Sequence, residues 1–299
     1  MLSDLIAKVL PIFPKSLVYV FAKKYIAGPT LDDAIRVTKE LMKLNGMSTI
    51  DVLGEFVETK DAALHEVKQC HQVIEAIHTN NLNSYLSIKP TSVGLGIDYD
   101  FGYENIKNLV AKAKSYGLRA RLDMENSPYT DITLKVYKQL RQEGFDNVGI
   151  VLQAYMKRSE SDVKSLIEYK PNVRLCKGIY NESPSIAFKG KDEIRDNYKK
   201  LLRLMFDNNF YIGIATHDEP LIQDAENEIK RRNLSVNDYE FQMLLGVREE
   251  KRNELLQKGH HLRVYVPFGE DWFGYSTRRL KENPQMVSHI VKSIFGINK

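Results

Sequence analysis

The sequence predicts an α/β protein whose main domain is a (βα)8 barrel, a TIM-like fold of eight parallel strands alternating with helices. Eight short runs rich in β-branched and apolar residues recur along the chain, and stretches with apolar residues at helical spacing separate them. Such alternation is typical of βαβ units and a parallel sheet. The first strand is followed by a single glycine, Gly54, rather than by a phosphate-binding glycine turn, and this favours a barrel over a doubly wound sheet.

The first 47 residues are expected to be helical and to precede a barrel domain of residues 48–299. Thr30 and Asp33 form a capping-box pattern that predicts a helix ending at Asn45 and Gly46. An earlier helix is predicted by apolar residues at helical spacing, namely Leu2, Leu5, Ile6, Val9 and Leu10. We expect it to pack on the barrel rather than on a bilayer, because its polar face is short of Lys and Arg.

The barrel elements follow in order along the chain. The expected strands cover residues 49–57, 84–90, 118–125, 147–155, 172–178, 211–218, 239–246 and 261–269. Clear helical periodicity between them covers residues 62–77, 106–116, 132–140 and 194–210. A last helix around residues 286–294 is expected to close the barrel.

Composition and motifs exclude several classes of protein. The net charge of +4 arises from mixed charges with no basic run beyond doublets, so no nucleic-acid-binding surface is predicted. No apolar stretch is long enough to span a membrane, no signal peptide opens the chain, and the two cysteines form no CxxC motif. We therefore expect a cytoplasmic protein that at most lies on the inner membrane surface. No metal-binding, Walker or serine-hydrolase motif is present, and His71 and His78 have no third metal ligand nearby.

Polar residues gather at the carboxyl ends of predicted strands two to eight, where a barrel builds its active site. They are Lys89; Arg121, Asp123 and Glu125; Gln153 and Tyr155; Arg174, Lys177 and Gly178; Thr216, His217 and Asp218; Gln242; and Tyr265. A single charged residue at the end of a barrel strand often has only a structural role, as part of an ion pair. Seven consecutive strands that each deliver a polar group to one end predict a functional site.

Arg278 and Arg279 lie in the expected first turn of the last helix, where cations oppose the helix dipole at about 0.3–1 kcal/mol each. They could form a solvated face with an Arg278–Glu282 pair. The alternative that explains both cations is an anionic ligand, a carboxylate or phosphate held by two guanidinium groups. For the site as a whole, Lys177 also admits a Schiff-base lyase of class I aldolase type. A catalytically inactive binding barrel is a third class, which the number of convergent charges disfavours.

The chain resembles the catalytic domain of the proline dehydrogenase family from about residue 47 to its end. The motifs that carry the resemblance are RLDME (121–125), LQAY (152–155), VRLCKGIY (173–180), ATHD (215–218), FQMLLGV (241–247) and VPFGEDWFGYSTRRLKENP (266–284). The resemblance implies a distorted (βα)8 barrel with non-covalently bound FAD and no aldehyde dehydrogenase domain. Oxidation of L-proline to Δ1-pyrroline-5-carboxylate by hydride transfer, with a quinone at a membrane surface as electron acceptor, is implied as well.

The resemblance also implies roles for individual residues. Substrate binding falls to Arg278, Arg279 and Lys89 on the proline carboxylate, Tyr275 and Leu244 on the ring, and Tyr265 at the pocket wall. Asp123 and Arg174 match active-site positions, and Glu282 matches a gate on the arginine pair. Flavin-contacting positions are Met124, Gln153, Lys177, Gly178, Ile179, Thr216 and His217. Ile179 departs from the family, which more often has Ala there.

Overall fold

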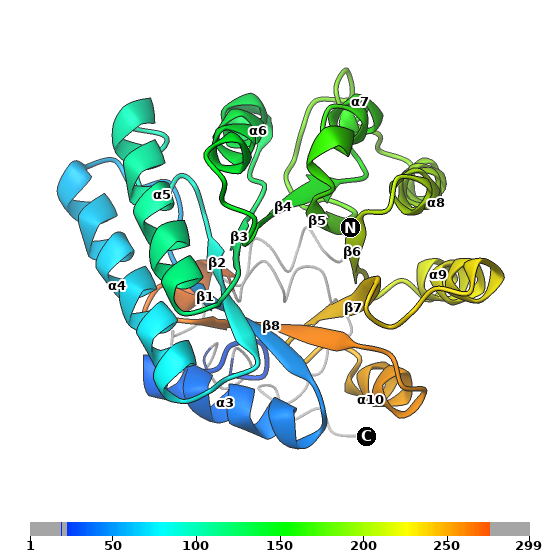
Figure 1. The fold of residues 1–299 in the computed structure, drawn as a ribbon, viewed down its shortest axis with the longest axis horizontal. Coiled ribbons are helices and arrows are strands. Elements are labelled where there is room, and N and C mark those ends of the chain that lie inside the picture. Colours follow the sequence, from blue (N-terminus) through cyan, green and yellow to red (C-terminus); the bar gives the residue numbers. More distant parts are fainter. Residues whose placement is uncertain (1–18, 20–22, 276–299) are drawn as a thin grey trace, which may run out of the picture.

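A closed barrel of eight parallel strands forms the centre of the protein (Figure 1). The computed structural model describes Tyr19 and residues 23–275. Each strand pairs with the next one in the chain, and β8 pairs with β1 to close the ring. The strands are β1 (Met47–Val52), β2 (Ser84–Ile88), β3 (Ala120–Leu122), β4 (Val148–Gln153), β5 (Asn172–Cys176), β6 (Tyr211–Ala215), β7 (Tyr239–Leu244) and β8 (Leu262–Phe268). The predicted (βα)8 fold is confirmed.

The helices surround the barrel (Figure 1). They are α3 (Leu31–Lys43), α4 (Lys60–Thr79), α5 (Tyr99–Ser115), α6 (Ser127–Gln142), α7 (Ser159–Lys164), α8 (Lys191–Asp207), α9 (Glu219–Arg232) and α10 (Glu249–Gln257). The predicted helix near the N-terminus and the predicted last helix lie outside the described residues. Among the described residues, no helix has the length and apolar character needed to cross a membrane.

Helix α3 begins where the sequence predicts. The backbone N–H of Asp33 donates to Oγ1 of Thr30 at 3.3 Å, and the backbone N–H of Thr30 donates to Oδ2 of Asp33 at 3.2 Å. These two bonds form the capping box and satisfy donors that the first helical turn leaves free. Just before the helix, Tyr25 and Ile26 are buried, and the N–H of Ala27 donates to the carbonyl of Pro267 in β8 at 2.8 Å. This stretch therefore packs on the barrel.

Strand alternation separates an apolar shell from a polar interior. In β8, Leu262, Val264 and Val266 belong to the hydrophobic core, whereas Arg263 and Tyr265 between them contact polar side chains of other strands. Hydrogen bonds between non-adjacent strands, such as Tyr85 in β2 to Glu240 in β7 at 3.0 Å, have to cross the barrel interior. Period-two alternation thus aims one set of side chains at the helices and the other at the barrel axis.

Several elements differ from the predicted boundaries. Most strands end one to three residues before the predicted ends, so the residues that follow form loops at the mouth of the barrel. Helices α5 and α6 begin earlier than the apolar periodicity indicates, because start signals set their first residues: Asp98 caps α5, and Pro128 stands in the first turn of α6. Asp98 caps α5 by accepting from the N–H of Phe101 at 2.7 Å.

Candidate active site

The carboxyl-terminal mouth of the barrel brings together most of the described polar residues that the sequence singles out. Lys89 and Asp123 directly follow β2 and β3, and Gln153 and Leu244 end β4 and β7. Lys177 directly follows β5. Because all strands are parallel, their carboxyl ends meet at one rim, which is where barrel enzymes place their chemistry.

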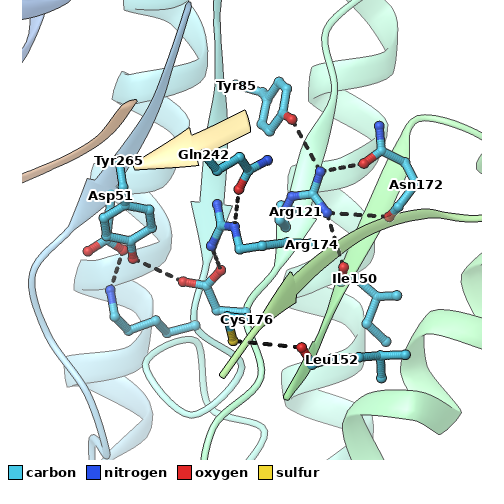
Figure 2. Close-up of polar contacts among 12 residues, drawn as sticks. Asp51, Tyr85, Arg121, Ile150, Leu152, Asn172, Arg174, Cys176, Gln242 and Tyr265 are labelled. Carbon is cyan, nitrogen blue, oxygen red and sulfur yellow. Dashed lines mark hydrogen bonds and ion pairs between the residues drawn. The ribbon is translucent and has the colours of Figure 1, made fainter. Parts of the chain in front are cut away.

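Asp123 is the centre of a hydrogen-bonded network across this mouth. Its other members are Arg174, Gln242 and Tyr265 (Figure 2). Its Oδ1 accepts from Nη1 of Arg174 at 2.8 Å, and its Oδ2 accepts from the hydroxyl of Tyr265 at 2.9 Å. Nε of Arg174 donates to Oε1 of Gln242 at 2.6 Å. Burial and the Asp123 carboxylate hold the pKa of Tyr265 well above its usual range, so its hydroxyl keeps the proton that it donates. The network fixes a carboxylate, a guanidinium and a phenol from three strands.

Asp51 in β1 is a site residue that the sequence prediction missed. Its Oδ1 accepts from Nζ of Lys89, which also donates to the carbonyl of Val52 at 3.2 Å. Burial raises the pKa of Asp51 to about 6, and the nearby charge of Asp123 adds to this while Lys89 opposes it. The signal in the sequence is an acidic residue that interrupts the apolar run at 49–57.

Glu125 is a second buried carboxyl group near the mouth. It accepts from the backbone N–H of Thr91 at 2.8 Å and from the Thr91 hydroxyl at 2.5 Å. Its own carbonyl accepts from Nε2 of Gln153 at 2.9 Å, which positions the Gln153 amide. Burial raises the pKa of Glu125 to about 7 despite the two hydrogen bonds from Thr91.

A charged group is formed by Lys177 after β5, Asp218 after β6 and Arg195 in α8. Nζ of Lys177 lies 3.1 Å from Oδ2 of Asp218, and Nη2 of Arg195 lies 2.8 Å from Oδ1 of Asp218. The hydrogen bonds from Arg195 and Lys177 lower the pKa of Asp218 to about 2, against the effect of burial. Asp218 stands at the N-cap of α9 yet makes no capping bond, because its carboxylate faces these cations.

The other residues matched to flavin contacts lie on the same rim. Thr216 is buried and accepts from the N–H of Asp218 at 3.1 Å. Nε2 of His217 accepts from the N–H of Leu244 at 2.9 Å, which fixes the imidazole against β7. Met124 is buried, whereas the side chain of Ile179 is 56% exposed.

Gly178 provides a close approach of backbone in this rim. Its φ is +108°, and a Cβ placed there would collide with the ring of Tyr155. The glycine therefore allows the chain to turn sharply between Lys177 and the exposed Ile179. This turn, the partly exposed cation Lys177 and the neighbouring amide and hydroxyl groups supply hydrogen-bond donors of the kind that phosphates and a flavin ring accept.

Arg121 does not lie in this site, and its prediction was wrong. It is only 1% exposed, and its guanidinium donates to the carbonyls of Ile150 at 3.0 Å and Asn172 at 3.3 Å and to the hydroxyl of Tyr85 at 3.2 Å (Figure 2). Asn172 and Tyr85 stand at the amino ends of β5 and β2. Arg121 and Asp123 are two residues apart, so both point toward the barrel interior. Arg121 lies nearer the amino end of β3, and its long side chain bends toward the amino-terminal end of the barrel.

Tyr275 is buried at the end of the described residues. The remaining predicted site residues, Arg278, Arg279 and Glu282, lie outside them. Within the described part of the chain, no group of three His, Cys, Asp or Glu side chains is placed to hold a metal ion.

Comparison with known proteins gives a consistent result. Residues 34–292 match the family model described as proline dehydrogenase. Proline dehydrogenase 1 of Bacillus subtilis is 35% identical over 273 residues, which cover 91% of this chain and 90% of the relative. Proline dehydrogenase 2 of the same species is 37% identical over 275 residues, covering 92% and 90%. Proline dehydrogenase of Deinococcus radiodurans is 35% identical over 277 residues, covering 91% and 89%.

The structure also resembles part of a larger enzyme. Proline utilization A from Bdellovibrio bacteriovorus, inactivated by N-propargylglycine, superposes with a TM-score of 0.86 at 23% sequence identity. The alignment covers 93% of this chain and 36% of that chain. The likeness supports the barrel fold.

Proposed function

The chain belongs to the proline dehydrogenase family of oxidoreductases that act on CH–NH groups, and from this we propose the details of its reaction. The protein oxidises L-proline to Δ1-pyrroline-5-carboxylate, with non-covalently bound FAD as hydride acceptor and a quinone as final electron acceptor. The observation that carries this proposal is the network of Asp123, Arg174, Tyr265 and Gln242 at the same rim as the dinucleotide-compatible turn at Gly178.

The protein's part in this reaction is binding, orientation and electrostatics. Oxidation removes a hydride from the ring carbon beside nitrogen and a proton from the nitrogen, and FAD when bound accepts the hydride. Leu244 and Tyr265 are register partners on adjacent strands, so their side chains lie side by side on one face of the sheet. In the proposal they form an apolar wall for the pyrrolidine ring together with Tyr275. Arg278, Arg279 and Lys89 hold the carboxylate, and Glu282 gates the arginine pair.

Flavin binding is assigned to Met124, Gln153, Lys177, Gly178, Ile179, Thr216 and His217. Replacing Lys177 or Gln153 by Ala is expected to lower the flavin content of the purified protein without changing its circular dichroism spectrum. Lys68→Ala is the matched control, because Lys68 is an exposed lysine of α4. Full flavin retention in both site variants would contradict this placement.

The function is tested by turnover with L-proline. We expect the purified protein to reduce a water-soluble quinone analogue in the presence of L-proline and to release the cyclic imine. The rival function is the Schiff-base lyase, in which borohydride would trap a carbonyl substrate on Lys177. The structure gives this rival little support, since Lys177 is paired with Asp218 and partly exposed rather than held in an apolar pocket. If the purified protein is colourless, does not turn over proline and forms a borohydride-trapped adduct on Lys177, the lyase function would replace the proposal.

A quinone is a membrane substrate, so the proposal also places the protein at a membrane surface. The apolar stripe of Leu2, Leu5, Ile6, Val9 and Leu10, which lies outside the described residues, is the candidate contact. The alternative, which its few Lys and Arg favour, is that this stripe packs on the barrel, and unfolding of a chain without it would establish that role instead. A chain lacking residues 1–18 is expected to keep turnover with a water-soluble acceptor but to bind lipid vesicles less. Unchanged vesicle binding by the shortened chain would remove this role.

A further inference from the structure

A polar cavity of about 360 Å³ opens at the amino-terminal end of the barrel, opposite the candidate active site. Its deeper residues stand at the starts of strands, and its rim is formed by the turns that precede β3, β4, β5 and β7. The lining residues are Tyr85, Arg119, Arg141, Asp146, Lys170, Asn172, Tyr211, Asn237, Glu240 and Arg263. Proline oxidation at the other mouth uses none of them.

Three cations of this cavity have no ion-pair partner among the described residues. Arg119 and Lys170 are exposed on the rim and lie within 4.0 Å of no described carboxylate. Arg141 donates only to the hydroxyl of Tyr137, at 3.0 Å. The one rim carboxylate, Asp146, is already paired with Lys114 at 3.3 Å. Like charges that converge on one cavity repel each other, so the arrangement favours an anion between them.

The floor of the cavity does not offset this positive charge. The Glu240 carboxylate accepts from Nε of Arg263 at 2.8 Å and from the hydroxyls of Tyr85 and Tyr211, each at 3.0 Å. Burial opposes its charge, but Arg263 and these donors lower the pKa of Glu240 to about 2, so it is a charged and fully engaged partner of Arg263.

Arg121 adds a second buried cation beneath the cavity. Its guanidinium donates to Tyr85 and Asn172, which both line the cavity, and to the carbonyl of Ile150, but to no carboxylate. Its Nε is buried without a hydrogen-bond partner. No described carboxylate contacts this buried guanidinium, so its positive charge adds to that of the cavity above it.

We propose that this cavity is a binding site for a small anion that carries phosphate groups. Arginine forks match the geometry of phosphate oxygens, and Arg119 and Arg141 reach the cavity from different elements, before β3 and at the end of α6. The volume lies at the low end of the ~300–1,000 Å³ range of small-molecule sites, which is more than one phosphate needs. The cavity therefore has room for an anion with at least two phosphate groups.

The site is tested by titrating the flavin-loaded protein with inorganic phosphate and with pyrophosphate in a calorimeter at constant ionic strength. We expect saturable binding of one pyrophosphate, tighter than that of phosphate. Arg119→Gln and Lys170→Gln are each expected to weaken it by about tenfold, the loss of one charge-assisted contact. Lys68→Gln removes the same charge from α4 and should leave binding unchanged.

Two comparisons decide whether binding is at this cavity. Arg278→Gln should leave pyrophosphate binding intact although it weakens proline binding, whereas Arg119→Gln and Lys170→Gln should keep proline turnover and thereby report an intact fold. Absence of saturable binding would overturn the proposal. Equal weakening by Lys68→Gln, or loss of binding only in Arg278→Gln, would overturn it as well, since the anion would then bind by general charge or at the other mouth.

Discussion

Three cations of the candidate active site each have a carboxylate partner. Lys89 is paired with Asp51, Arg174 with Asp123, and Lys177 with Asp218. A charge that is already paired attracts a substrate carboxylate less than an unpaired one does. The proposed clamp therefore depends mainly on Arg278 and Arg279, and Lys89 contributes as a hydrogen-bond donor within its ion pair.

Arg278→Ala and Arg279→Ala are each expected to raise the Michaelis constant for L-proline by about 10- to 100-fold, because a charge-assisted bidentate contact contributes about 1.5–3 kcal/mol. Lysine at either position should rescue only partly, since an ammonium group cannot make the planar two-point contact. Steady-state kinetics with each variant measures the effect.

Proline methyl ester is the matched control substrate for the clamp, because it lacks the carboxylate charge. The ester should be a poor substrate of the unmodified protein, and its Michaelis constant should rise little further in the arginine variants. Near-normal affinity for proline in the Ala variants, or an equal loss for acid and ester, would show that the pair is a solvated helix end.

Glu125 predicts a pH dependence of stability. Its pKa rises from an ordinary 4.5 to about 7 in the folded protein, so folding favours its protonated form. The stabilisation from this group is fully present below pH 4.5 and is lost as the pH rises through 7. Glu125→Gln mimics the protonated form. Between pH 5 and pH 8 the free energy of unfolding of the unmodified protein, measured with denaturant, should fall by roughly 2–3 kcal/mol relative to that of this variant. A constant difference between the two proteins across this range would show that Glu125 titrates normally.

At the scale of elements, the loops after the strands carry the site while the strands carry the core. β5 ends at Cys176, and the turn at Gly178 immediately follows it. The strand pattern predicted this element, whereas the sharp turn depends on a positive φ and on the Tyr155 ring, neither of which periodicity reveals.

Gly178→Ala is expected to destabilise the protein by more than the ~1 kcal/mol that a positive φ alone costs, because its Cβ would also displace the Tyr155 ring. Gly144→Ala is the matched control: its φ is +87°, and nothing lies within 4 Å of an added Cβ. Thermal unfolding and flavin content of both variants measure the effect. Equal destabilisation with full flavin content in both would mean that the turn has no role in the site.

Strand periodicity and parallel topology together predict where the mouth lies, so Lys89, Asp123 and Arg174 were correctly placed near one another. Asp51 was missed because it lies early in the predicted strand 49–57, whereas the observed strand β1 already ends at Val52. Arg121 was misplaced because periodicity gives the face of a strand but not the direction in which a long side chain bends along the barrel axis. Pairings such as Asp123 with Tyr265 join residues far apart in sequence, and only the closed barrel reveals them.

At the scale of the whole molecule, the barrel interior is a polar column between two mouths of different chemistry. Gln242 links the layers, since it donates to Glu240 near the amino-terminal cavity and accepts from Arg174 in the active-site network. The column occupies space that aliphatic side chains fill in many barrels, and the hydrophobic core lies instead between strands and helices. The interior is thus filled by polar side chains that bond to one another.

The central claim is that the carboxyl-terminal mouth oxidises L-proline on bound flavin. The most direct measurement is the visible spectrum of the purified protein, titrated with L-proline without oxygen. The account predicts a yellow protein whose oxidised flavin absorbance is bleached by L-proline in proportion to the flavin bound, and by proline methyl ester only weakly. A flavin spectrum that L-proline leaves unchanged, or a purified protein that holds no flavin even after incubation with FAD, would contradict it.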